Sequence, residues 1–184
     1  YRDEVNRQNA NAHQGIIYCT NLCTEITQNQ SPTELIDQYI ENENIIVKKY
    51  NAGDFVVCNL SSINLGRAVP DEVLERLIKI QVRMLDNVID INTLPIKQAE
   101  ITNKKYRAIG LGTFGWHHLL ALKSIEWESE EAVQYADELY EKIAYYTIKS
   151  SMELSKEKGS YPLFEGSKWS SGEYFSNKGY SGEL

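Results

Sequence analysis

Residues 54–65 read DFVVCNLSSINL, and this run decides the fold class that the sequence predicts. It is almost continuously apolar from Phe55 to Leu60, which is typical of a strand buried on both faces of a sheet. The preceding run, IIVKKY (45–50), is β-prone, and Asn51-Ala52-Gly53 between the two runs favours a hairpin. A further extended segment, strand or loop, is expected at 16–27, IIYCTNLCTEIT.

Helices are expected between and after these extended runs. Ser31-Pro32-Thr33-Glu34 has the form of a capping box and predicts a helix that ends in the polar run 41–44. Pro70-Asp71-Glu72 suits the start of a long helix with apolar residues at helical spacing. The same reasoning predicts helices at 96–102, 106–122 and 129–158, the last closed by Gly159, while 1–15 reads as a helix end and loop and the tail after 160 as an ordered loop.

The fold class is therefore α/β, with two or three strands separated by crossovers among four or five helices. So few strands cannot complete a barrel or a doubly wound sheet, so their buried faces need partners outside this chain. The sequence begins with Tyr1 rather than Met and ends without an evident tail. We expect a piece of a longer polypeptide.

Composition narrows the function classes. The 184 residues are 42% hydrophobic and 24% charged, as in a folded protein. Nineteen Lys and Arg against 26 Asp and Glu give a net charge of −7 without a basic cluster, which argues against a sequence-independent nucleic-acid binder. No run approaches the roughly 20 apolar residues of a membrane helix, and no signal peptide is evident. Three cysteines are too few for a secreted disulfide framework, which favours the cytoplasm.

Asn21-Leu22-Cys23-Thr24-Glu25 is the densest group of reactive side chains. In an extended segment Asn21, Cys23 and Glu25 would project to one side, presenting an amide, a thiol and a carboxylate, with Leu22 and Thr24 facing the opposite way. Taken alone, such a group is more often a polar strand face with a small buried Cys. Cys58 taken alone also reads as a buried structural residue, and the spacing of Cys19 and Cys23 is not that of a C-x-x-C motif.

Gly110–Gly115 matches the G-x-G-x-x-G pattern of dinucleotide-binding loops. The run before it, NKKYR, is polar rather than an apolar strand, and the acids about 20 residues further on begin a helix. An NAD-dependent oxidoreductase is therefore a weak alternative. The glycines more plausibly let the backbone approach a packed helix closely. His117 and His118 are adjacent and cannot share a helical face, so no metal site is expected.

Four segments in the same order resemble the large, catalytic subunit of class I ribonucleotide reductase, in its class Ib form. They are YCTNLCTEI (18–26), GDFVVCNLSSINLG (53–66), RAIGLGTFGWHHLLA (107–121) and YPLFEGSKWSSGEYF (161–175). The resemblance implies that residues 1–184 form a helix-rich fragment of a ten-stranded α/β barrel. The finger loop would be 16–27 and a barrel strand 54–65, with the family's N-terminal and C-terminal parts absent.

The resemblance also implies reduction of ribonucleoside diphosphates at C2′ by a thiyl-radical mechanism. Cys23 would remove the 3′ hydrogen, Glu25 would accept the 3′-hydroxyl proton and Asn21 would hydrogen-bond the ribose, with Leu22 and Thr24 completing the substrate contact. Cys58 would be one member of the dithiol that becomes a disulfide, its partner lying outside this chain. In this family the Gly-x-Gly motif is structural.

The implied partners are a metal-containing small (beta) subunit that generates the radical, a thioredoxin- or glutaredoxin-type reductant, the remaining segments of the large subunit and a homodimer of the complete subunit. No metal or cofactor is expected in this chain. Neither a membrane nor DNA is expected as a partner. The alternative is a catalytically silent fragment with at most an assembly role. Such a fragment should not bind nucleotide, and it should aggregate through its unpaired strand edges.

Overall fold

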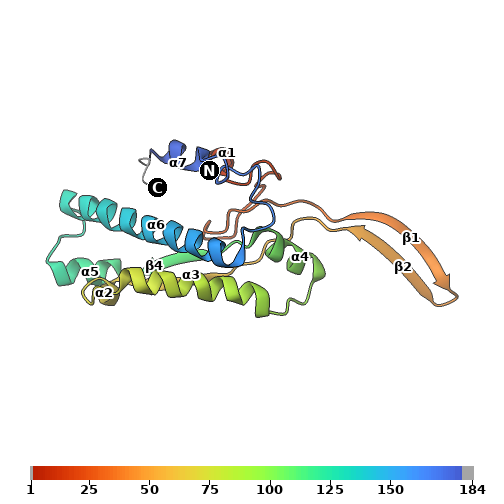
Figure 1. Ribbon diagram of the computed structural model, residues 1–184, viewed down its shortest axis with the longest axis horizontal. Helices are drawn as coiled ribbons and strands as arrows, with labels where there is room; N and C mark the ends of the chain where they lie inside the picture. The colour runs from red at the N-terminus through yellow and green to blue at the C-terminus, as the bar shows by residue number, and fades with distance from the viewer. Residues whose placement is uncertain (1, 180–184) are drawn as a thin grey trace. The chain divides into compact units, whose positions relative to one another are not determined.

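A computed structural model describes residues 2–179 (Figure 1). Within them the chain divides into two compact units, of which the first contains 2–58, 92–108 and 161–179, and the second 59–91 and 109–160. None of the helices in the described residues combines the length and apolarity needed to cross a bilayer.

The second unit contains a parallel pair of strands, β3 (Leu60–Asn64) and β4 (Gly110–Phe114), aligned from Leu60 opposite Gly110 to Asn64 opposite Phe114. Within this unit the chain forms α2 (Leu65–Ala68) and α3 (Leu74–Ile91) after β3, and α5 (Trp116–Lys123) and α6 (Glu130–Lys158) after β4. A strand, a helical connection and a second parallel strand make the crossover expected of an α/β sheet.

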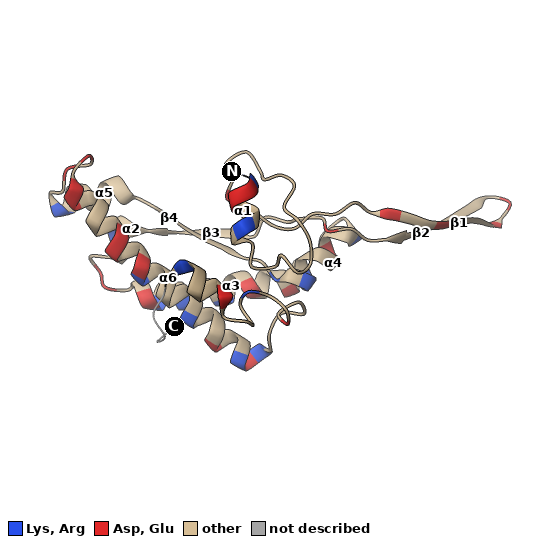
Figure 2. Ribbon diagram, turned by 90° about the horizontal axis from the view of Figure 1, so that it is seen from above, with Lys and Arg blue, Asp and Glu red and all other residues tan. Residues whose placement is uncertain are grey.

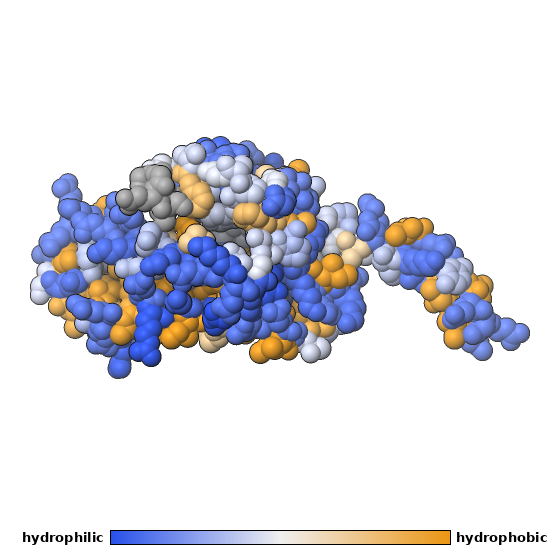
Figure 3. Space-filling model, viewed as in Figure 1, coloured by the Kyte–Doolittle hydropathy of each residue, from blue (hydrophilic) through white to orange (hydrophobic). Residues whose placement is uncertain are grey.

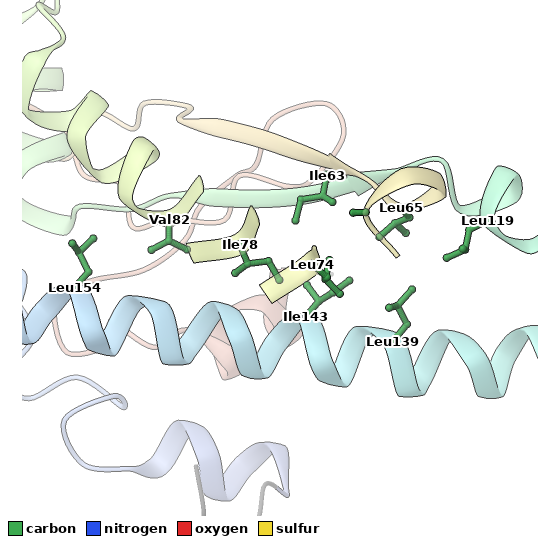
Figure 4. Packing of buried hydrophobic residues seen from close by; sticks show 10 residues of the cluster. Ile63, Leu65, Leu74, Ile78, Val82, Leu119, Leu139, Ile143 and Leu154 are labelled. Carbon is green, nitrogen blue, oxygen red and sulfur yellow. The ribbon is translucent and has the colours of Figure 1, made fainter. Parts of the chain in front are cut away.

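The apolar core of this unit lies between α3 and α6, under β3 and α5. Figure 4 shows side chains of the two helices pointing toward one another. The cluster comprises Ile63, Leu65, Ala68, Leu74, Ile78, Val82, Leu119, Leu139, Ile143 and Leu154. Burying such side chains stabilises a fold by about 1.5–3 kcal/mol each, so this cluster is the main source of cohesion in the unit.

The longest helix follows its sequence signals. The Ser129 side chain accepts a hydrogen bond from the backbone N–H of Ala132 (3.1 Å), and Gly159 ends the helix with φ of +89°. These findings confirm the predicted helix at 129–158. Helix α3 begins at Leu74, later than the predicted Pro70, because Glu72 has a positive φ of +54° that a helix cannot contain.

The predicted helix at 106–122 is wrong in its first half. α4 (Lys97–Tyr106) is closed by its C-cap residue Arg107, whose φ is +46°. Gly110–Phe114 then pairs with β3. A Cβ at Gly110 would lie 2.3 Å from Leu60 Cδ2, so glycine permits this strand pairing. The close backbone approach expected of these glycines therefore occurs beside a strand rather than a helix.

The first unit contains α1 (Arg2–Gln8), α4, α7 (Glu173–Lys178) and an antiparallel hairpin of β1 (Glu34–Asn42) and β2 (Ile45–Asn51). The backbone N–H of Asn44 bonds the Asn42 side chain in the hairpin turn. The strand at 45–50 is thus confirmed, but its predicted partner at 54–65 is wrong. Figure 3 shows hydrophobic residues among hydrophilic ones along this hairpin, Leu35, Ile40 and Ile46 being exposed.

The predicted helix starting at Ser31 is also wrong. The Ser31 hydroxyl, expected to cap it, instead accepts a hydrogen bond from Asp54 N (2.8 Å), and the nearby Thr33 Oγ1 accepts one from Gly53 N (3.1 Å). A helix cap and a tertiary contact compete for the same hydroxyl, and here the tertiary contact is formed. The residues from Glu34 onward then pair as a strand. The prediction for the tail is correct to Gly172 and then gives way to α7, while residues 180–184 lie outside the described residues.

Candidate functional site

The segment that carries Asn21, Cys23 and Glu25 is a closed loop, residues 16–30. Gln30 N donates to Ile16 O (3.1 Å), which joins the two ends of the loop. The Gln30 side chain strengthens this closure, because its Oε1 accepts from the backbone N–H groups of Tyr18 and Cys19 (3.0 Å each) and its Nε2 donates to Cys19 O (2.9 Å). One glutamine thus fixes the leading arm of the loop to the trailing arm.

Helix α1 and the segment after it hold the same loop from outside. The Asn6 side chain makes two hydrogen bonds to the backbone of Ile17, at 2.8 and 2.9 Å. Asn29, only 2% exposed, donates to Asn11 O (2.8 Å) and accepts from Asn9 Nδ2 (2.7 Å). Both ends of the loop are therefore anchored by amide side chains with satisfied hydrogen bonds.

The tip of the loop is a tight turn rather than an extended segment. Thr24 N donates to Asn21 O (3.1 Å), and Thr24 has a φ of +68°. The predicted alternation, with Asn21, Cys23 and Glu25 on one side and Leu22 and Thr24 on the other, is therefore wrong, because a turn breaks the two-residue period of a strand. The five residues instead lie consecutively around one turn.

The reactive side chains of this turn are accessible. Cys23, Thr24 and Glu25 are exposed, and Leu22 is 99% exposed, so Leu22 does not pack against the part of the chain that the structure describes. The Asn21 side chain is partly buried, and its Oδ1 accepts a hydrogen bond from Ile26 N (3.0 Å). The arrangement presents a thiol and a carboxylate to solvent from a loop whose base is fixed.

A cavity of about 230 Å³ lies between α1 and the leading arm of this loop. It is lined by Arg2, Val5, Ile17, Tyr18, Cys19, Thr20 and Thr24. Of the five candidate residues at the tip, Thr24 alone is among this lining, and the thiol there is that of Cys19. Neither Cys23 nor Glu25 lines this cavity, so we do not assign it to the substrate.

Cys58 does not lie in a buried strand as predicted. Strand β3 begins at Leu60, and all three thiols of the chain, Cys58 included, are free and exposed. The expected strand is shortened because side chains, not a neighbouring strand, bind the backbone at its start. Thr102 Oγ1 accepts from Phe55 N (2.8 Å), next to the bonds that Asp54 N and Gly53 N make to Ser31 and Thr33.

The G-x-G-x-x-G residues do not form a phosphate-binding loop. Such a loop joins a strand to a helix, whereas Gly110 and Gly112 lie inside β4. A Cβ at Gly112 would lie 3.3 Å from Ser62 Oγ on the neighbouring strand. This placement supports a structural role for the motif.

Sequence reasoning missed the residues that hold the loop, namely Asn6, Asn29 and Gln30. The available signal was the density of Asn and Gln in residues 1–30. Amide side chains serve both as donors and as acceptors, so a cluster of them can replace a strand ladder in fixing an irregular backbone.

Comparison with known proteins places this geometry in context. Residues 1–181 match the family described as "Ribonucleotide reductase, barrel domain". The ribonucleoside-diphosphate reductase subunit alpha of Treponema pallidum is 46% identical over 188 residues, covering 100% of this chain and 22% of the relative. The subunits of the same name from Helicobacter pylori and Chlamydia trachomatis are 38% and 42% identical, each over 94% of this chain and over 26% and 15% of their own lengths. The chain thus spans at most about a quarter of these curated relatives.

Proposed function

The chain belongs to the ribonucleotide reductase barrel-domain family, and we propose that it supplies the radical-bearing loop and one reducing thiol to a complete large subunit that converts ribonucleoside diphosphates to 2′-deoxyribonucleoside diphosphates. The observation that carries the proposal is the loop 16–30, which exposes Cys23 at the tip while its base is fixed by hydrogen bonds. The helices and the parallel strand pair of the chain fit a fragment of the family's α/β barrel.

The first step assigned to this loop is cleavage of the C3′–H bond. A thiyl radical at Cys23, formed by a radical-generating small subunit, takes the 3′ hydrogen, and the Glu25 carboxylate accepts the 3′-hydroxyl proton as a general base. Both side chains are exposed and separated by one residue of a turn, so one sugar can contact both. Asn21 Oδ1 already accepts from Ile26 N, so the amide offers its Nδ2 hydrogens to a ribose oxygen.

Reduction at C2′ then consumes two electrons and two protons. The 2′-hydroxyl leaves as water, and two thiols supply the hydrogen equivalents as they join in a disulfide. The Cys23 thiol then returns the hydrogen to C3′, which regenerates the thiyl radical. We assign one of these thiols to Cys58 and the other to a cysteine outside this chain. A thioredoxin- or glutaredoxin-type dithiol then reduces the disulfide. The exposure of Cys58 in this chain supports such contacts, because a thiol must be reached both by substrate and by reductant.

The loop contains a matched pair of thiols for testing the radical assignment. Cys19 and Cys23 are both exposed and lie four residues apart, but Cys19 occupies the leading arm and Cys23 the tip. In the complete large subunit, assayed with its small subunit, Cys23→Ser should abolish deoxynucleotide formation while nucleotide binding persists. Cys19→Ser should retain activity within about threefold, because it removes a thiol of equal exposure without touching the reacting atoms.

Deoxynucleotide formation by the Cys23→Ser subunit at the normal rate would remove Cys23 from the radical role. Loss of nucleotide binding in wild-type subunit and variant alike would favour the alternative, a catalytically silent chain. Cys58→Ser gives an independent check, since it should prevent sustained turnover with dithiol reductant. Normal sustained turnover by that variant would exclude Cys58 from the reducing pair.

A further inference from the structure

A buried ionic group in the first unit takes no part in the proposed chemistry. Asp54 is 9% exposed and Tyr106, at the end of α4, is 7% exposed. Tyr106 Oη donates to Asp54 Oδ2 (2.8 Å), and Lys105 Nζ donates to Asp54 Oδ1 (2.8 Å). The carboxylate is therefore bound at both oxygens, which offsets the cost of burying its charge.

This group contacts both segments that carry proposed redox cysteines. Asn29, at the base of loop 16–30, donates a hydrogen bond from its Nδ2 to Tyr106 Oη (3.4 Å). Asp54 precedes Cys58 by four residues, and its own N–H is bound by Ser31 Oγ just after the loop. The tyrosine hydroxyl thus joins the base of the Cys23 loop to the segment leading to Cys58.

The protonation state suits this arrangement. Burial raises the pKa of Tyr106 to about 12, so the phenol keeps its proton at neutral pH and donates it to Asp54. The same oxygen can then accept from Asn29. Removing the hydroxyl would leave the Asp54 carboxylate short of one donor and Asn29 short of one acceptor, in a place where both are buried.

We propose that Tyr106 and Asp54 are positioning residues that set the separation between the Cys23 loop and the Cys58 segment during reduction. The proposal rests on the proposed function, because it assigns these residues to the same site. Neither residue touches substrate in this account. They act through Asn29 and through the backbone at 53–55, and a displacement of about 1 Å at reacting atoms can reduce a rate by about two orders of magnitude.

The test uses the complete large subunit with its small subunit and compares Tyr106→Phe and Asp54→Asn with Tyr140→Phe. Tyr140 is the control, because its hydroxyl also takes part in side-chain hydrogen bonding (2.7 Å to Thr113 Oγ1) but is more exposed and lies in the second unit. We expect Tyr106→Phe to lower kcat by roughly 10- to 100-fold while KM changes less than about twofold. Asp54→Asn should do the same, and Tyr140→Phe should leave both constants within about twofold.

Two further readouts separate positioning from simple loss of folded protein. The fraction of correctly folded subunit is measured by nucleotide binding stoichiometry, and the yield of oxidised Cys58 at a fixed early time under single-turnover conditions is measured by mass spectrometry. We expect full stoichiometry with a reduced yield of oxidised Cys58. An unchanged kcat in both variants, or a kcat that falls only in proportion to binding stoichiometry, would overturn the proposal.

The same experiment distinguishes failure of this inference from failure of the proposed function. If Cys23→Ser is inactive while Tyr106→Phe and Asp54→Asn are fully active, the positioning role is wrong and the function stands. If Cys23→Ser is fully active, the function itself is wrong, and the positioning role falls with it.

Discussion

In the second unit Ile78, Val82 and Ile143 belong to one cluster of buried apolar side chains, whereas in the first unit the buried side chains of Asn29, Asp54 and Thr102 each form hydrogen bonds. An apolar core tolerates small displacements, because dispersion forces and the hydrophobic effect are not directional. Hydrogen bonds depend on distance and angle, so they fix an irregular backbone more narrowly. The unit that carries the candidate cysteines is the one held by directional bonds.

The largest effect that tests this comparison is expected from the apolar core. Ile78→Ala should destabilise the second unit by about 3–4 kcal/mol, because it removes a fully buried side chain and leaves a cavity. Hydrogen exchange in the complete subunit, followed on peptides of α3 and α6, measures the loss. If the exchange increase were equal on peptides of loop 16–30, the two units would not be energetically separate.

A smaller but more local effect is expected at Gly53. A Cβ there would lie 2.2 Å from Ser31 O, a backbone atom that cannot move without breaking the bonds at 53–55. Gly53→Ala should cost about 2–3 kcal/mol and expose the peptide that contains Cys58 to exchange. Gly112→Ala is the control, because its nearest neighbour, Ser62 Oγ, would be 3.3 Å away and belongs to a side chain. Equal effects of the two substitutions would contradict the account.

Gln30→Ala should have a moderate effect confined to the loop. It removes the bonds to the backbone of Tyr18 and Cys19, and one hydrogen bond contributes about 1 kcal/mol. We expect loss of about 1–2 kcal/mol of local stability and faster proteolytic cleavage between residues 16 and 30. Gln134→Ala, which removes an exposed contact to Glu138 on α6, is the matched control. Unchanged cleavage of the loop would show that Gln30 does not close it.

The smallest effect is expected from the exposed ion pairs between α3 and α6. Figure 2 shows acidic and basic residues interspersed along these helices, where Lys79 pairs with Glu153 and Arg83 with Glu157. Hydrogen bonding from Arg83 lowers the pKa of Glu157 below its ordinary value of 4.5. A carboxyl whose pKa is lower in the folded state stabilises it above the unfolded pKa, and this contribution is lost as the pH falls.

Arg83→Gln should therefore change the exchange rates of α3 and α6 little at any pH and make their acceleration below about pH 4.5 slightly less steep. Hydrogen exchange at several pH values, corrected for the intrinsic rate, measures the difference. A large loss at neutral pH would mean that these pairs, rather than the apolar cluster, hold the two helices together.

The contrast between the units also explains what the sequence could predict. Apolar spacing and the signals at Ser129 and Gly159 located α6, because the residues that decide a helix in an apolar core lie within it. The strand β1 was missed because the expected cap, Ser31, and its neighbour Thr33 accept hydrogen bonds from a backbone segment about 20 residues away in sequence. No local pattern contains that information.

For the candidate site, the family resemblance of the motifs identified the residues, and the structure supplied their geometry. Asn21, Cys23 and Glu25 are grouped in sequence and stay grouped in space, but on a turn rather than on one face of a strand. The turn depends on the Asn21 contact to Ile26 N and on the closure of the loop at Gln30. Side-chain bonds to the backbone set both, and strand periodicity does not describe such bonds.

The most direct test of the central claim, that the tip of loop 16–30 meets the substrate sugar, is a crystal structure of the complete large subunit with a ribonucleoside diphosphate bound. The account predicts the Cys23 sulfur within roughly 3.5–4 Å of C3′, the Glu25 carboxylate at the 3′-hydroxyl and the Asn21 amide at a ribose oxygen. A ribose bound elsewhere, with the tip of the loop free of contact to it, would contradict the account.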